Sequence, residues 1–232
     1  MALCAVLTGC GGGRVTAAAP NEPGFVPTTV PPQVTAVVSG LQNPWGLAFL
    51  PDARMLVTGR MGQLWLISAD GLSVQDIIGL PAVTATSGQG GLLDAVIDPA
   101  FASNRYIYLS YSEADGTNPS LNGTAVARAE LDLGTRSLLG LTVIYRQSPK
   151  VASTGHFGSR LVFARDGTLF VTLGERQSAD QRVFAQDLGR GNGKVVRILN
   201  GGGAAPGNPF ASTPGAPVSY THLRAHETSL HL

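Results

Sequence analysis

The residues with the clearest capacity for chemistry lie in the run 154–161, Thr-Gly-His-Phe-Gly-Ser-Arg-Leu. Its histidine, His156, stands between Gly155 and Gly158, and the other three histidines fall in the last fifteen residues. Imidazole is the side chain that most often serves as a general base near neutral pH. His156 is therefore the candidate catalytic residue, and a surface-loop histidine without a catalytic role is the alternative that this residue alone leaves open.

The elements that must position His156 read as β-strands. Residues 161–164 form an apolar run, 165–167 supply turn residues, and 168–174 return as a second apolar run. Runs of this kind are four to eight residues long, bounded by Gly, Pro or Asp, and typical of strands. No long stretch has a helical period, so the sequence predicts an all-β protein. The other such runs are 45–50, 55–58, 62–67, 92–97, 106–111, 125–131, 141–146 and 193–199.

One unit recurs, in which an apolar strand ends in an aspartate-containing turn and a second apolar strand follows. It is centred on Asp52, Asp98 and Asp166, at spacings of 46 and 68 residues. A repeat near ~45 residues with about four strands is the signature of β-propeller blades. A polar loop at 113–124 is expected to account for the longer spacing. At this period residues 34–217 supply about four blades.

Composition excludes several classes of protein. The chain has 232 residues, 30 glycines, 15 prolines, 13% charged residues and a net charge of +1. These values fit a turn-rich β domain and exclude a disordered or coiled-coil chain. The scattered basic residues argue against nucleic acid as a partner. No apolar run approaches the ~20 residues of a membrane-spanning helix.

The two cysteines, Cys4 and Cys10, both lie in the first ten residues. Residues 1–10 form a short apolar stretch ending in Leu-Thr-Gly-Cys, which resembles the bacterial lipobox and predicts a signal peptide with lipidation of Cys10. No Lys or Arg precedes Arg14, so an upstream start is expected, and a fortuitous apolar start is the alternative. Residues 11–33 are rich in Gly and Pro and predict a tether. We therefore expect an exported, periplasmic protein that meets the membrane only through a lipid anchor.

Four segments carry a family resemblance, and they occur in the family's order across roughly residues 34–210. The chain resembles the soluble aldose sugar dehydrogenases, relatives of the soluble quinoprotein glucose dehydrogenase. The resemblance implies a six-bladed β-propeller that uses pyrroloquinoline quinone (PQQ) and Ca²⁺. This chain would be its N-terminal half, an arc of about three to four blades at residues 34–217. The segments are 40–47, 88–94, 155–161 and 187–198.

The resemblance also implies roles for single residues. His156 matches the base that takes the proton of the anomeric hydroxyl while hydride leaves C1 of an aldose for the quinone, giving the lactone. Gln89 matches a glutamine that hydrogen-bonds sugar or cofactor, and a plain turn residue in a glycine-rich run is its alternative. An external electron acceptor would reoxidise the quinone. Gly155 replaces the aspartate of glucose-specific relatives, which implies a broader range of sugars.

The end of the chain departs from the family. A Gly-His-Arg-Asn motif is expected near residues 220–224, but residues 218–232 resemble a translated sequencing adapter and are predicted to be a non-native tail. Calcium ligands and most contacts to the quinone therefore cannot be assigned. No residue of this sequence is predicted to be a metal ligand. Two other functions stay open: a non-catalytic propeller that binds carbohydrate or protein, and a propeller lactonase-type hydrolase with Asp94 and Glu175 as metal-binding carboxylates.

Overall fold

The structure is a computed structural model that describes residues 33–216 and 218–222. Residues from Val37 onward form one compact unit, and residues up to Ala36 are a separate one. The predicted signal peptide with Cys10, most of the tether and residues 223–232 lie outside the described residues. No helix within the described residues is long and apolar enough to cross a membrane.

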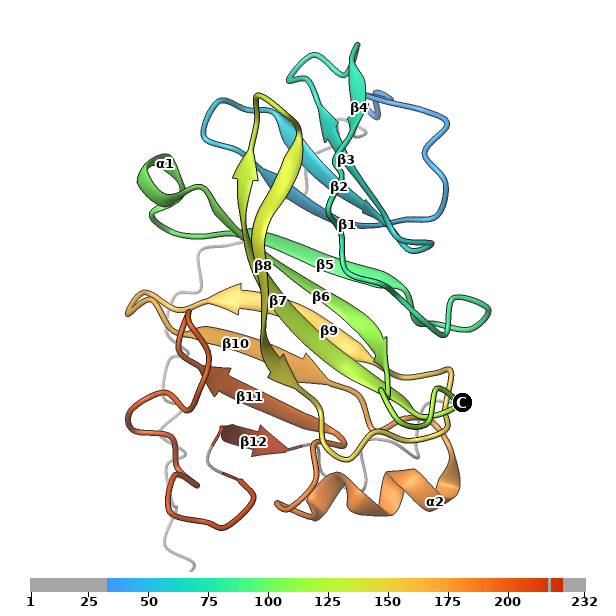
Figure 1. The fold of residues 1–232 in the computed structure, drawn as a ribbon, viewed down its shortest axis with the longest axis vertical. Coiled ribbons are helices and arrows are strands. Elements are labelled where there is room, and N and C mark those ends of the chain that lie inside the picture. Colours follow the sequence, from blue (N-terminus) through green and yellow to red (C-terminus); the bar gives the residue numbers. More distant parts are fainter. Residues whose placement is uncertain (1–32, 217, 223–232) are drawn as a thin grey trace, which may run out of the picture. The chain divides into compact units, whose positions relative to one another are not determined.

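Three four-stranded antiparallel sheets make up the compact unit, and the strands of each sheet follow one another in chain order (Figure 1). Two short helices, α1 (Phe101–Asn104) and α2 (Ala179–Arg182), and the 3₁₀ helix η1 (Val183–Gln186) lie between strands. The first sheet contains β1 (Pro44–Phe49), β2 (Met55–Gly59), β3 (Gln63–Ile67) and β4 (Val74–Asp76). The second contains β5 (Leu92–Ile97), β6 (Tyr106–Ala114), β7 (Asn122–Asp132) and β8 (Ser137–Arg146). The third contains β9 (Gly158–Phe163), β10 (Leu169–Leu173), β11 (Lys194–Ile198) and β12 (Ser219–His222).

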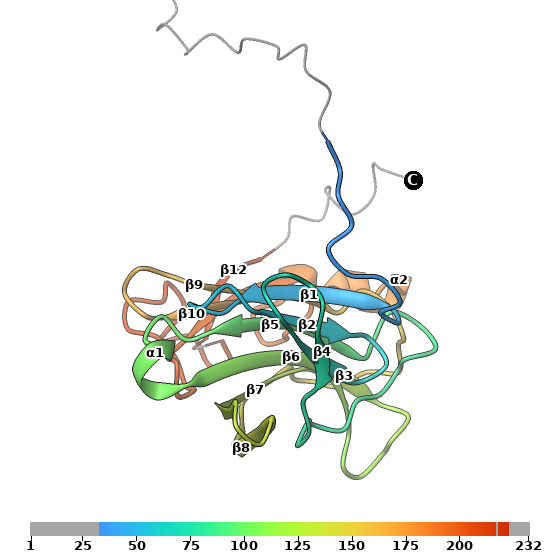
Figure 2. The ribbon, with the colours of Figure 1, turned by 90° about the horizontal axis from the view of Figure 1, so that it is seen from above.

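The sheets are successive blades of a β-propeller. Their first strands contact one another, β1 with β5 and β5 with β9, and the later strands of each sheet follow outward, as Figure 2 shows for β5 to β8. The prediction of an all-β propeller arc of three to four blades is confirmed, with three blades. The number is at the lower end of that prediction because β6, β7 and β8 are 9, 11 and 10 residues long. The loop expected at 113–124 is shorter than predicted: residues 115–121 connect the strands, whereas 113–114 belong to β6 and 122–124 to β7.

The repeated aspartate has the same structural role in every blade. Asp52, Asp98 and Asp166 each lie between the first and second strands, and each Oδ1 accepts a hydrogen bond from the backbone N–H two residues later. The N···O distances are 3.1, 2.8 and 3.0 Å. An aspartate that caps its own turn in this way tightens the connection between the two strands. The predicted repeat therefore marks a real structural equivalence between the blades.

The strand pattern continues beyond residue 217, into the segment predicted to be a non-native tail. β12 pairs with β11 in antiparallel register, with Lys194 opposite His222 and Val195 opposite Thr221. This pairing satisfies backbone groups along an edge of β11 that would otherwise lack partners. The assignment of residues 218–232 as a non-native tail stays a prediction.

Neighbouring blades are held by apolar clusters and by one buried carboxylate. The first cluster joins β2, β3, β5, β6 and β7, and the second joins β6, β7, β9, β10 and β11. Between blades two and three, Asp94 accepts hydrogen bonds from the Leu161 N–H at 2.8 Å and from Arg160 Nη1 at 3.0 Å. Burial raises the pKa of Asp94, and its hydrogen bonds oppose that rise. Asp94, a candidate metal-binding carboxylate in the hydrolase alternative, therefore ties two blades together.

Candidate active site

His156 and Glu175 face each other just beyond the end of the β9–β10 ladder. Gly158 pairs with Leu173 there. His156 lies two residues before Gly158 and Glu175 two residues after Leu173, so the same register brings them opposite each other. His156 Nδ1 is hydrogen-bonded to Glu175 Oε1. Cross-strand register thus places the candidate base beside a carboxylate although 19 residues separate the two in the chain.

This close approach depends on Gly174. An ideal Cβ at position 174 would lie only 1.9 Å from the backbone oxygen of His156, so any side chain there would displace the His156 loop. The Gly174 N–H also donates to the Phe157 carbonyl at 3.1 Å. A glycine here lets the two loops touch through their backbones.

The hydrogen bond between His156 and Glu175 determines which imidazole nitrogen can accept a proton. The Glu175 side chain is 9% exposed and that of His156 is 41% exposed. When Nδ1 carries the hydrogen and donates it to the carboxylate, Nε2 is left as an acceptor on this partly exposed ring. This is the arrangement of a general base whose orientation and tautomer are set by a second group.

Gln89 joins the same site from the neighbouring blade. It lies in the loop before β5, and its Oε1 accepts a hydrogen bond from the His156 N–H at 2.8 Å. The backbone N–H of Gln89 also donates to the Thr154 carbonyl at 2.7 Å. The carboxamide NH₂ of Gln89 stays available as a donor to a ligand. The structure thus brings together both site residues expected from the sequence, His156 and Gln89.

A buried arginine, Arg176, supports the backbone of the His156 loop. Its guanidinium donates to the carbonyls of Gly155 and Ser153 and to both the carbonyl and Oδ1 of Asn122, at 2.7 to 3.1 Å. It also stacks 3.9 Å above the ring centre of Phe157. Burial lowers the pKa of Arg176 to about 10. Because the side chain is 0% exposed, these bonds replace its hydration and make it a rigid support.

A second arginine, Arg60, holds the Gln89 loop. It lies in the turn after β2, and its Nη1 donates to the carbonyls of Thr86, Gly88 and Gly90 at 2.7, 2.7 and 3.1 Å. The residues on both sides of Gln89 are therefore fixed through their backbones. Guanidinium forks suit this role because one side chain offers several directed donors.

Sequence analysis missed the supporting residues. Glu175 was considered only as a metal-binding carboxylate, and Arg60 and Arg176 were not singled out. An acidic residue directly after an apolar strand, as in Leu-Gly-Glu at 173–175, is the only signal that could have pointed to Glu175. Arg60 and Arg176 bind backbone carbonyls, and such contacts leave no pattern in a sequence.

Metal-binding groups do not gather in the described part of the chain. No cluster of three His, Cys, Asp or Glu side chains occurs among the described residues. Of the two carboxylates expected in a hydrolase site, Asp94 binds Arg160 and the Leu161 N–H, whereas Glu175 binds His156. The structure does not bring these two together as a metal site.

Comparison with known proteins decides the family. The family model described as Glucose / Sorbosone dehydrogenase matches residues 41–222. The chain belongs to the glucose/sorbosone dehydrogenase family. The aldose sugar dehydrogenase YliI of Escherichia coli K12 is 43% identical over 193 residues, which cover 82% of this chain and 49% of the relative. The chain thus spans about half the length of that relative.

Solved structures agree with the fold. A crystal structure of a glucose dehydrogenase, 41% identical, superposes with a TM-score of 0.74 and covers 81% of this chain and 54% of its own. The PQQ-bound form of an aldose sugar dehydrogenase from Streptomyces coelicolor is 30% identical, with a TM-score of 0.68 and coverage of 80% and 52%. The resemblance inferred from the sequence is therefore confirmed at the level of family and propeller fold.

Proposed function

We propose that this chain forms the part of a PQQ-dependent aldose dehydrogenase that carries the catalytic base. The reaction oxidises an aldose at C1 to the lactone, and an external acceptor takes up the electrons. The observation that carries the proposal is the His156–Glu175 pair, which leaves Nε2 of an exposed imidazole as a proton acceptor. Family membership and the PQQ-bound relative support the choice of reaction.

The roles of the chain's own residues follow from this geometry. His156 Nε2 takes the proton of the anomeric hydroxyl as the C1–H bond breaks, because loss of hydride from a carbon that kept its O–H would leave positive charge there as a protonated lactone carbonyl. The imidazolium that forms is stabilised by the carboxylate of Glu175. Gln89 donates its carboxamide N–H to the sugar or the cofactor, and its Oε1 keeps the His156 backbone in place. When bound, PQQ supplies the two-electron acceptor.

The residues present fit the sugar-facing side of such a site. His156 offers an acceptor and Gln89 a neutral donor, which match a hydroxyl to be deprotonated and an oxygen to be held. No calcium ligand is assigned, because the described residues contain no acidic cluster. The proposed Ca²⁺ and most contacts to the quinone are expected on parts of the enzyme beyond the three blades described.

We expect the 232-residue chain on its own not to oxidise aldoses. Its described residues form three blades, and the chain spans about half the length of its relative. A propeller gains stability and a complete site by closing its ring. The test adds PQQ and Ca²⁺ to the purified chain and follows dye reduction with several aldoses. Sustained turnover above the rate of the cofactor without protein would refute this expectation.

We further propose that the protein is exported and lipidated at Cys10, given an upstream start. Cys10 lies outside the described residues, and the lipobox-like Leu-Thr-Gly-Cys run is the support. Labelling with palmitate in a bacterial host, using the gene with its natural start, should mark the wild type and leave Cys10→Ser unlabelled. Equal labelling of the two proteins would reject the anchor.

A further inference from the structure

Three Asn-Gly pairs occur in the chain, and the fold places them in very different surroundings. The pairs are Asn122-Gly123, Asn192-Gly193 and Asn200-Gly201. In such a pair the backbone nitrogen of the glycine can attack Cγ of the asparagine, because glycine has no side chain to hinder the approach. The reaction needs a carboxamide that is free to turn and a glycine N–H that is not hydrogen-bonded. The folded structure therefore decides which pair reacts.

Asn200 meets both requirements. It lies two residues after the end of β11, and both Asn200 and Gly201 are exposed. The Gly202 N–H donates to the Leu199 carbonyl at 2.9 Å, which places Asn200 and Gly201 at the two central positions of a tight turn. Within the described residues, neither the Asn200 carboxamide nor the Gly201 N–H forms a hydrogen bond. The carboxamide can therefore turn toward the Gly201 nitrogen without breaking a contact.

A cation lies beside the same peptide bond. Arg128, in β7 of the second blade, donates from Nη1 to the Asn200 carbonyl at 3.4 Å, and its Cζ lies 4.5 Å from the ring centre of Tyr106. The Asn200 carbonyl and the Gly201 N–H belong to one peptide bond, so the positive charge favours the loss of the N–H proton that precedes attack. Arg128 would also pair with a carboxylate formed at position 200.

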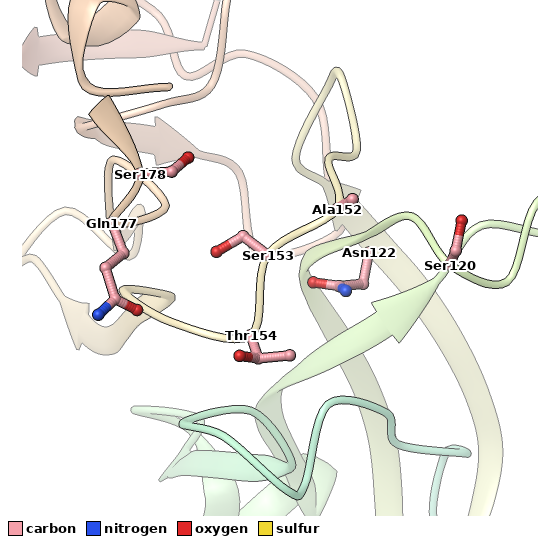
Figure 3. Close-up of a pocket in the computed structure, with 7 residues that line it drawn as sticks. All are labelled: Ser120, Asn122, Ala152, Ser153, Thr154, Gln177 and Ser178. Carbon is pink, nitrogen blue, oxygen red and sulfur yellow. The ribbon is translucent and has the colours of Figure 1, made fainter. Parts of the chain in front are cut away.

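Asn122 is the matched control for Asn200, because both stand in the sequence Leu-Asn-Gly. Asn122 begins β7 and is 5% exposed. With Ser153 it lines an open pocket of about 430 Å³ (Figure 3), but its carboxamide is not free. Arg176 Nη2 donates to Asn122 Oδ1 at 2.7 Å, and Nη1 donates to the Asn122 carbonyl at 3.0 Å. Turning toward Gly123 would break a hydrogen bond to a buried charged group, and such bonds are stronger than those between neutral groups.

Asn192 is held in a similar way. It is 0% exposed, and its Nδ2 donates to the Glu175 carbonyl at 3.4 Å and to Gln181 Oε1 at 3.3 Å. The Gly193 N–H donates to the Gly174 carbonyl at 3.1 Å, so the attacking nitrogen is engaged as well. Both buried pairs can therefore react only after the structure opens locally.

We infer that Asn200 is a site of spontaneous deamidation and that the fold protects Asn122 and Asn192 from the same reaction. The deprotonated nitrogen of Gly201 forms a bond to Cγ of Asn200, and the carboxamide nitrogen leaves as ammonia. Water then opens the cyclic imide at either of its carbonyls, which gives aspartate or isoaspartate at position 200. No oxidant or reductant takes part. This modification site is independent of the proposed function.

The test is incubation of the folded 232-residue chain at mildly alkaline pH in water enriched in ¹⁸O, followed by proteolysis and mass spectrometry of the three Asn-Gly peptides. Asn200 is expected to deamidate at least ~10-fold faster than Asn122 or Asn192, because an opening that costs only about 1.4 kcal/mol already reduces the reactive population by that factor. The product at position 200 should carry the heavy oxygen. In the urea-unfolded chain the rates at Asn122 and Asn200 should become equal, because the two share the same neighbours.

Two variants test the chemistry of the reaction itself. Gly201→Ala should slow deamidation at Asn200 several-fold by hindering the attack, and the methyl group fits because an ideal Cβ there lies 3.6 Å from Arg128 Nη1. Asn200→Gln should abolish the labelled product at this position and leave the other two peptides unchanged. Equal rates at the three pairs in the folded chain, a faster reaction at Asn122 or Asn192, or an unchanged rate in Gly201→Ala would overturn the inference.

Discussion

His156→Ala is expected to lower kcat for aldose oxidation by ~10²–10⁴-fold in the complete enzyme, with the remaining blades restored from the gene. This loss corresponds to roughly 3–5.5 kcal/mol of transition-state stabilisation. The reason is that Nε2 is the acceptor for the anomeric proton, while Nδ1 is committed to Glu175. Steady-state dye reduction with saturating PQQ and Ca²⁺ measures the effect, and circular dichroism checks that the fold is retained.

Gln89→Ala is the matched comparison within the same site. A neutral carboxamide cannot act as the base, so this variant should raise KM for the sugar or weaken cofactor binding more than it lowers kcat. A wild-type kcat in His156→Ala with the quinone bound would remove the base assignment and favour the non-catalytic binding propeller.

Arg176→Met is expected to destabilise the 232-residue chain by about 2–4 kcal/mol. Methionine keeps apolar bulk over Phe157, but the buried carbonyls that the guanidinium binds lose their donors. Loss of the guanidinium hydrogen bonds destabilises the variant, because charged donors bind more strongly than neutral ones. Removal of the buried charge acts in the opposite direction, because it recovers part of the desolvation cost of that charge. The hydrogen bonds outweigh that recovery because one side chain satisfies four contacts. Urea unfolding of variant and wild type gives the difference.

Arg165→Met is the control for the loss of a positive charge. Arg165 is exposed in the turn between β9 and β10, and its replacement should change the free energy of unfolding by less than about 0.5 kcal/mol. If Arg176→Met unfolds at the same urea concentration as Arg165→Met, the buried Arg176 contacts contribute nothing to the free energy of unfolding. The role given to Arg176 in supporting the His156 loop would then be wrong.

Much of the fold could be predicted from local sequence. Alternating apolar runs and the aspartate turns at Asp52, Asp98 and Asp166 gave the all-β class and the repeated unit, since turn residues and strand periodicity are local properties. The number of blades could be predicted only as three to four because strand length is not local. The ladder of β6, β7 and β8 extends as far as partners are available for pairing, and nothing in a single run sets that limit.

The site was predictable only in part. His156 and Gln89 could be found because each stands in a glycine-rich run that matches the family. Their direct contact depends on two loops from different blades, and the partnership with Glu175 depends on the β9–β10 register. The left-handed backbone of Gln177, with a φ angle of +69°, could not be predicted, since it is imposed by contacts of Arg176 with residues far away in the chain.

The central claim is that His156 serves aldose oxidation by a bound quinone. Its most direct test is stopped-flow absorbance of the PQQ-loaded complete enzyme mixed with glucose or with glucose deuterated at C1. The account predicts that glucose reduces the quinone in a fast single turnover, that deuterium slows this step, and that His156→Ala slows it by ~10²–10⁴-fold. Absence of quinone reduction in the wild type, or an unchanged rate in His156→Ala, would contradict it.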